Sequence, residues 1–198
     1  MPVIDITTQI AAPIQRVFDL SRSVDLHAAS TAQTGERAIA GVTSGLLSLG
    51  QEVTWRARHF GIWQRLTSRI TVFDPPNHFH DSLVRGAFRG FDHDHFFSQH
   101  GEVTTMRDVF DFQSPLGILG RIADYLVLTR YLIHFLTVRN ATIKDATETD
   151  EWPALCSKDR TNRWNERRTA VGSTFEMALI FSLRAIRAII RRRLSCSR

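Results

Sequence analysis

The chain has 198 residues and a formal net charge of +5, and hydrophobic residues make up 43% of it. This length is enough for one well-filled core and an appended segment, but it is short for two full domains. No run approaches the roughly 20 consecutive apolar residues of a membrane-spanning helix, so the composition predicts a folded, water-soluble protein. The first residues lack the basic and apolar regions of a secretory signal, so the expected location is the cytoplasm.

The surplus of positive over negative charge comes from the last quarter of the chain. Residues 1–150 carry 14 Lys and Arg against 16 Asp and Glu, whereas residues 151–198 carry 11 against 4. Because the main part has no basic surplus, no specific nucleic-acid partner is predicted for it. The two cysteines, Cys156 and Cys196, have neither the number of a disulfide framework nor the spacing of a metal site.

The first 30 residues predict one strand and two short helices. Residues 3–10 alternate with period two, which is typical of a strand. Pro13 suits the start of a helix, where its missing N–H is not needed. Ser23 is a good N-cap for a second helix that ends near Ser30. A turn and a short strand are expected next.

From residue 51 to residue 112 the period is again two, which predicts consecutive antiparallel hairpins. Residues 52–59 place Trp55 and His59 on one face. A two-residue turn that begins at Gly61 would set Trp55 opposite Ser68, because glycine tolerates the positive φ of this turn.

Residues 114–148 have the three- and four-residue recurrence of a long helix that starts at a capping serine and a first-turn proline. The fold class is therefore α+β. We expect a curved antiparallel sheet of about six to seven strands around a long C-terminal helix, with two short helices after the first strand.

The stretch FDHDHFF, residues 91–97, concentrates titratable groups in one strand. Alternation sends Asp92 and Asp94 to one face, towards water, and both histidines to the other face. That second face carries several aromatic side chains, so it is the expected inner face.

The hairpin that contains this stretch gives the histidines partners. A turn within residues 99–102 makes opposing positions sum to 201. A three- or five-residue loop would instead set Arg107 opposite His93. The pairs predicted from the sum of 201 are Phe91 with Phe110, His93 with Asp108, and His95 with Met106.

Three roles are open for the histidine pair. Two histidines at i and i+2 on a strand bind a metal in cupin barrels, but the downstream glutamate spacing of those proteins is absent, and Asp108 or His59 would complete a ligand set only if the fold brought them close. General acid/base catalysis would use His93 as the base and Asp108 to orient it. We favour hydrogen-bonded polar groups in a mostly apolar interior that touches a ligand. Neither a metal nor another cofactor is predicted.

The segments GAFRGFDHDHFF and TTMRDVFDFQSPLGILG resemble the signature of bacterial ligand-binding members of the START-like superfamily, also called SRPBCC. This superfamily includes polyketide cyclase/dehydrase-like proteins and the birch-pollen-allergen fold. The resemblance covers about residues 2–148 and implies a helix-grip fold with a deep cavity for a hydrophobic ligand between sheet and helix. It implies no catalytic residues, because members include lipid and hormone carriers as well as aromatase/cyclases.

The C-terminal residues extend beyond this resemblance. Residues 149–173 are polar without a period, which predicts a linker. Residues 174–194 predict an additional, basic amphipathic helix with Arg184, Arg187 and Arg191 on one side. Such a helix can lie on an anionic membrane surface, dock on a partner protein or pack on its own domain.

The sequence thus predicts a START-like domain at residues 1–148 that binds a small hydrophobic or aromatic ligand. The alternatives are a cyclase, dehydratase or hydrolase-type enzyme that uses His93 and Asp108, and an adaptor or peripheral membrane protein that acts through residues 174–194. No oligomeric state is predicted. The expected ligand-binding side chains are Trp55, His59, Phe91, His93, His95, Met106, Asp108 and Phe110.

Overall fold

The computed structural model describes residues 2–114 and 127–149 of the chain. Its elements, in chain order, are β1 (Val3–Ile10), α1 (Ile14–Ser21), α2 (Val24–Ser30), the short 3-10 helix η1 (Ala32–Thr34), β2 (Arg37–Gly41), β3 (Glu52–His59), β4 (Ile62–Asp74), β5 (His78–Arg85), β6 (Gly90–His100), β7 (Val103–Gln113) and α4 (Thr129–Glu148).

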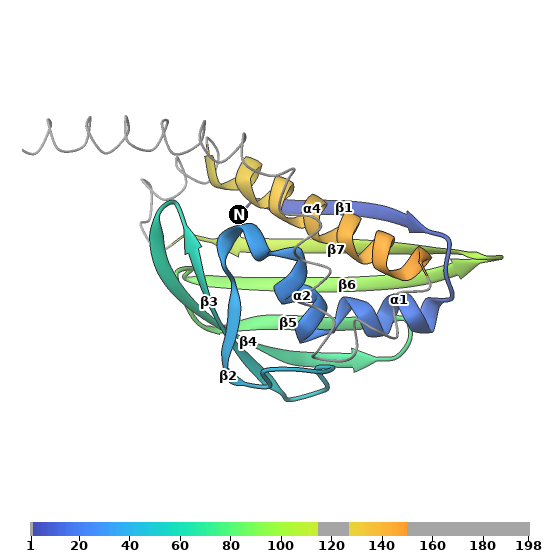
Figure 1. The fold of residues 1–198 in the computed structure, drawn as a ribbon, viewed down its shortest axis with the longest axis horizontal. Helices are drawn as coiled ribbons and strands as arrows, with labels where there is room; N and C mark the ends of the chain where they lie inside the picture. The colour runs from blue at the N-terminus through green and yellow to red at the C-terminus, as the bar shows by residue number, and fades with distance from the viewer. Residues whose placement is uncertain (1, 115–126, 150–198) are drawn as a thin grey trace, which may run out of the picture.

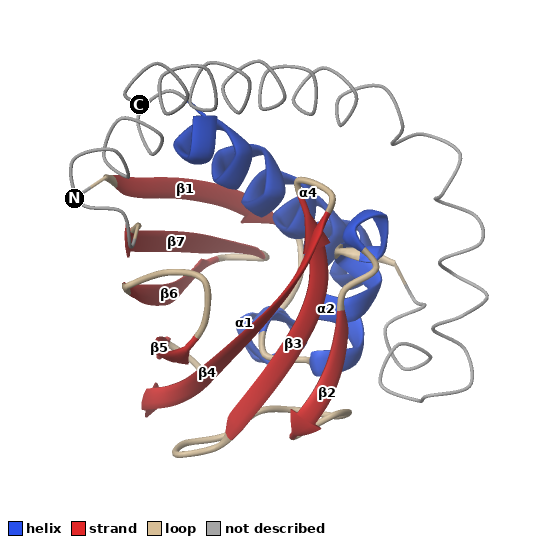
Figure 2. Cartoon of the chain, turned by 90° about the vertical axis from the view of Figure 1, so that its left-hand side faces the viewer, coloured by secondary structure: helices blue, strands red, loops and turns tan. Residues whose placement is uncertain are grey.

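The strands form one antiparallel sheet in the order β1-β7-β6-β5-β4-β3-β2. The sheet curves, and the helices lie on its concave side, with α4 running alongside β1 (Figures 1 and 2). This architecture confirms the predicted α+β fold, with a seven-stranded sheet curved around α4 and two short helices after the first strand.

The two short helices begin where the sequence predicts. Helix α1 follows Pro13 directly, and the side chain of Ser23 caps α2 by accepting a hydrogen bond from the backbone N–H of Leu26 at 3.2 Å. Phe18 and Leu26 are buried, so both helices turn an apolar side towards the sheet. The helices therefore close one part of the concave face.

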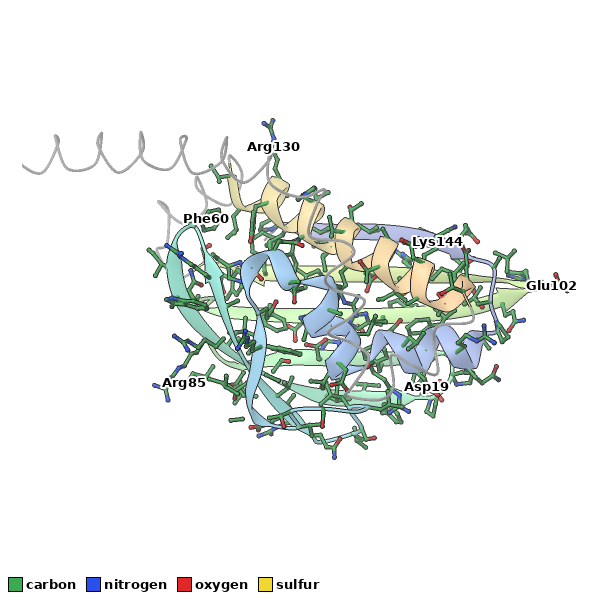
Figure 3. All side chains as sticks on the ribbon, viewed as in Figure 1. Asp19, Phe60, Arg85, Glu102, Arg130 and Lys144 are labelled. Carbon is green, nitrogen blue, oxygen red and sulfur yellow. The ribbon has the colours of Figure 1, made fainter. Side chains whose placement is uncertain are left out.

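The predicted register of the β3–β4 hairpin is wrong by two residues. His59 pairs with Ile62, so the turn consists of Phe60 and Gly61, whose φ angles are 53° and 77°. A two-residue turn with positive φ at both positions matches strand twist, but it is uncommon for a phenylalanine. Phe60, at the tip of this hairpin in Figure 3, packs its ring 4.7 Å from that of Tyr131.

The register of the β6–β7 hairpin is also wrong by two residues. His100 pairs with Val103, and Gly101 takes the first turn position with a φ of 60°. Glu102 stands at the far tip of this hairpin in Figure 3. Because the shift is an even number, every side chain stays on its predicted face. The observed opposing pairs are Phe91 with Phe112, His93 with Phe110, His95 with Asp108, and Phe97 with Met106.

The predicted long helix is present as α4, with Leu132, Leu136 and Ile143 buried against the rest of the domain. Its predicted first part, from residue 115 to residue 126, lies outside the described residues. The predicted linker and basic helix at residues 149–173 and 174–194 also fall outside them, apart from residue 149. Among the described residues, no helix has the length and apolar character needed to cross a membrane.

Candidate ligand-binding site

A cavity of about 330 Å³ lies between the concave face of the sheet and α4. Most of its wall is apolar, with Trp55 and Leu66 from the sheet and Leu132 and Leu136 from α4. Small-molecule pockets usually measure about 300–1,000 Å³, so this volume suits a small organic ligand.

Six of the eight side chains predicted for the ligand site line this cavity. Met106 and Asp108 do not, because both are completely buried behind the wall. The sulfur of Met106 instead accepts a hydrogen bond from the hydroxyl of Ser21 at 3.3 Å. The six that line the cavity are Trp55, His59, Phe91, His93, His95 and Phe110.

Asp108 is the centre of a buried polar group. Its Oδ1 lies 2.6 Å from Nδ1 of His95 and 3.3 Å from Nε2 of His93. Neither ring nitrogen has an aligned hydrogen-bond partner, so both are close polar contacts and not well-aligned hydrogen bonds. The predicted pairing of Asp108 with His93 is therefore corrected: Asp108 lies directly opposite His95 and reaches His93 as its second neighbour.

Helix α4 supplies two further members of the group. Asn140 donates through Nδ2 to Oδ2 of Asp108 at 2.7 Å, and Arg139 donates through Nη1 to Oδ1 at 3.4 Å. Arg139 also donates to the backbone carbonyl of Ser21 at 2.9 Å. The carboxylate is thus held by both the sheet and the helix.

Asp81 completes the group from the neighbouring strand β5, where it pairs with His93. Its Oδ1 accepts a hydrogen bond from Nε2 of His95 at 3.3 Å and lies 3.9 Å from Nδ1 of His93. The two histidines therefore lie between two carboxylates. We call Asp81, His93, His95, Asp108, Arg139 and Asn140 the buried charge cluster.

The two histidines of this cluster have opposite protonation tendencies. Burial and the neighbouring charge of His95 lower the pKa of His93 to about 4, despite Asp108. Burial alone would also lower the pKa of His95, but the adjoining Asp108 carboxylate outweighs it and raises that pKa.

The carboxylates of the cluster stay ionised. Burial would raise the pKa of Asp108, yet His95 and the other cationic neighbours hold it well below its usual value. Burial would likewise raise the pKa of Asp81, but the hydrogen bond from His95 and the nearby positive charges lower it. Below the raised pKa of His95, two carboxylates therefore face two cationic groups, His95 and Arg139. His93 is neutral above its pKa of about 4, so the formal charges of the cluster balance between these two pKa values.

A second polar group lies in the part of the wall formed by α2, β3 and α4. The hydroxyl of Tyr131 is 2.6 Å from Nδ1 of His59. The ring of His27 lies over Trp55 at 4.3 Å, and its Nε2 is 3.5 Å from Oε2 of Glu36. Burial opposes ionisation of Glu36, but His27 lowers its pKa.

The aspartates predicted to point to water differ from one another. Asp92 is exposed, although it accepts a hydrogen bond from the hydroxyl of Ser82 at 2.8 Å. Asp94 is less exposed and accepts from Nε2 of His78 and Nδ1 of His80, at 2.7 and 2.9 Å. These contacts lower the pKa of Asp94 against the effect of its partial burial. The predicted face is thus right, and both aspartates belong to a polar network with His80 on the convex side of the sheet.

Comparison with known proteins rests on structure. No protein-family model matches the sequence, and no curated protein matches it. A START superfamily protein from Mycobacterium smegmatis aligns with a TM-score of 0.57 at 13% identity, over 73% of this chain and 99% of its own. The protein TTHA0849 from Thermus thermophilus aligns with a TM-score of 0.58 at 17% identity, over 74% and 99%.

A plant protein shows the same likeness. Ginseng major latex-like protein 151 from Panax ginseng aligns with a TM-score of 0.55 at 17% identity, over 75% of this chain and 98% of its own. At these identities the likeness concerns the fold. The chain has the START-like, helix-grip fold that its sequence motifs predict.

Proposed function

We propose that this protein binds a small ligand with an aromatic or aliphatic body in the cavity between the sheet and α4. The observation that carries the proposal is the cavity itself, since its apolar wall is interrupted by a few convergent polar side chains. This combination is typical of ligand sites, and the START-like fold is a ligand-binding fold in general.

The charge balance of the buried cluster supports a neutral ligand. A charged ligand group placed beside it would bury an unpaired charge, which is costly. Neutral His93 can both donate and accept a hydrogen bond. We therefore expect the ligand to carry an uncharged polar group, such as a hydroxyl or a carbonyl, near His93, with its apolar body against Trp55, Phe91 and Leu136.

The enzymatic alternative receives less support from the site. A histidine whose pKa is lowered to about 4 is a weak general base at neutral pH. Asp108 also faces His95 across the strand pair, so it does not orient His93 alone. Binding requires neither property.

The proposal is tested by filling the cavity. Ala57 is 4% exposed and lines the cavity, whereas Ala40 is exposed on β2. Binding of a neutral naphthylamine dye is followed by fluorescence for the wild type, Ala57→Leu and Ala40→Leu. We expect Ala57→Leu to weaken binding at least about ten-fold, because the larger side chain occupies the ligand volume, and Ala40→Leu to bind as the wild type does. Equal affinity in all three proteins would contradict binding in this cavity.

A further inference from the structure

We propose that Asp81, His93 and His95 form a binding site for a divalent first-row transition-metal ion in the cavity wall. The inference goes beyond ligand binding and does not depend on it. The charge balance described above is that of the metal-free site, since an ion bound to Nε2 of His95 would displace the proton from that nitrogen. One donor atom from each residue lies within 4.8 Å of the donor atoms of the other two. No metal is predicted from the sequence, where Asp108 and His59 are the candidates for a third donor. In the fold, Asp81 of β5 takes that position instead.

The distances suit closure around an ion. Oδ1 of Asp81 is 3.3 Å from Nε2 of His95 and 3.9 Å from Nδ1 of His93. A tetrahedral ion with bonds of about 2.0–2.2 Å holds its ligand atoms about 3.3–3.6 Å apart. The two distances from Asp81 thus lie at or slightly above this spacing, and all three donor atoms lie within 4.8 Å of one another on two strands whose backbones are already paired.

The ring nitrogens of His93 and His95 that point away from Asp81 are arranged as in known metal sites. A histidine that binds a metal normally turns its other ring nitrogen to a carboxylate, which fixes the ring and its tautomer. Nδ1 of His95 and Nε2 of His93 both contact Asp108, at 2.6 and 3.3 Å. Asp108 is in turn fixed by Asn140 and Arg139. One carboxylate thus supports both proposed ligands.

A purely structural role explains the same atoms less well. Buried polar atoms in a settled core nearly always have aligned hydrogen-bond partners. Nε2 of His93 and Nδ1 of His95 have none, although the side chains of both residues are at least nine-tenths buried.

The donor set indicates which ions fit. Two imidazole nitrogens and one carboxylate oxygen suit zinc, iron, cobalt or nickel, whereas calcium and magnesium prefer oxygen ligands alone. Three protein ligands leave at least one coordination position open. Because Asp81, His93 and His95 all line the cavity, that position faces the space proposed for the ligand, whose hydroxyl or carbonyl oxygen would complete the coordination.

The test uses the full chain without a polyhistidine tag, freed of metal with a chelator. Zn²⁺ binding is measured by equilibrium dialysis and elemental mass spectrometry. We expect one ion per wild-type chain and a loss of affinity of more than about 100-fold in both Asp81→Asn and His93→Gln. The matched control is His80→Gln, since His80 contacts Asp94 on the opposite face of the same strands and offers the competing surface site. It should bind Zn²⁺ as the wild type does.

Two results would overturn the site. One is wild-type protein that retains no stoichiometric Zn²⁺, and the other is binding lost in His80→Gln but kept in Asp81→Asn. Co²⁺ added to the wild type gives a check that needs no variant to fold, because its visible absorption separates four- or five-coordinate from six-coordinate, water-like geometry. Dye binding is also measured with the metal-free protein. Dye binding without stoichiometric Zn²⁺ binding would contradict the metal site alone, and loss of dye binding would contradict the cavity proposal.

Discussion

His95 and Asp108 face each other across β6 and β7, with Nδ1 of the histidine 2.6 Å from Oδ1 of the aspartate. Their side chains are 2% and 0% exposed, so this is an ion pair in the interior of the domain. Because Arg139 and Asn140 of α4 bind the same carboxylate, the pair connects the sheet to the helix that covers it.

Removal of the Asp108 carboxylate should strongly destabilise the fold. In Asp108→Asn, protonated His95 and Arg139 lose their shared partner, and breaking a buried pair in this way costs about 3–5 kcal/mol. Urea denaturation measures the change. The matched variant Asp92→Asn alters an aspartate whose side chain is 63% exposed on the other face and should stay within about 0.5 kcal/mol of the wild type. Similar stabilities for both variants would show that the buried pair contributes little.

Stability should fall on acidification in the range set by His93. The folded-state pKa of His93 is about 4, while its unfolded value is near 6.5. Between about pH 6.5 and 4 the unfolded chain binds a proton that the folded chain does not, so the free energy of unfolding decreases by up to about 1.4 kcal/mol per pH unit. The raised pKa of His95 keeps it protonated in the folded state throughout this range, so its stabilising contribution is lost only at higher pH.

This slope is measured by urea denaturation at several pH values in the presence of a chelator. His93→Gln removes the titrating group and should remove most of the slope. His100→Gln changes an exposed histidine at the end of β6 and should retain it. An unchanged slope in His93→Gln would place the titration elsewhere.

The sequence predicts the face of each residue far better than its partner. Period two places His93, His95 and Asp108 on one buried face, because a side chain cannot change sides without a one-residue shift. The exact pairs depend on which two residues form each turn, and Phe60 adopts a positive φ that a sequence argument assigns to glycine. The registers predicted for both hairpins are therefore wrong by two residues. In the observed register Met106 lies opposite Phe97 and does not line the cavity.

The partners from other elements were missed for a different reason. Asp81 reaches the histidines only through the β5–β6 pairing, whose register depends on the loop between residues 85 and 90 and not on a two-residue turn. Arg139 and Asn140 do carry a signal, since they follow Leu136 by three and four residues and precede Ile143 on the same helical face. Polar side chains on the buried face of a helix indicate partners inside the domain, and here that partner is Asp108.

Trp55 should report ligand binding by its fluorescence. Its ring is 6% exposed and lines the cavity, whereas Trp63 is 52% exposed on β4 with Arg56 over its ring at 4.4 Å. Of these two tryptophans, a ligand in the cavity changes the surroundings of Trp55 only. We expect Trp55→Phe to abolish most of the ligand-induced change in tryptophan emission and Trp63→Phe to preserve it. The reverse pattern would locate the ligand on the outer surface.

The basic C-terminal segment should determine any attachment to membranes. Residues 151–198 carry 11 Lys and Arg against 4 Asp and Glu, and residues 174–194 have the pattern of a basic amphipathic helix. We expect the full chain to co-sediment with liposomes that contain anionic lipid, and a chain without residues 151–198 not to do so. Neutral liposomes are the control. Equal sedimentation of both chains would remove the membrane role of this segment.

The central claim, that a small apolar ligand binds between the sheet and α4, is tested most directly by amide-resolved NMR spectra of the wild type with and without a small neutral aromatic ligand. We predict that the largest chemical-shift changes occur at residues around the cavity, such as Ala57, Phe91, Leu132 and Leu136. Residues on the convex face, such as Val72 and Phe96, should change little. Saturable changes confined to the convex face, or no saturable change with any ligand of a chemically varied set, would contradict the claim.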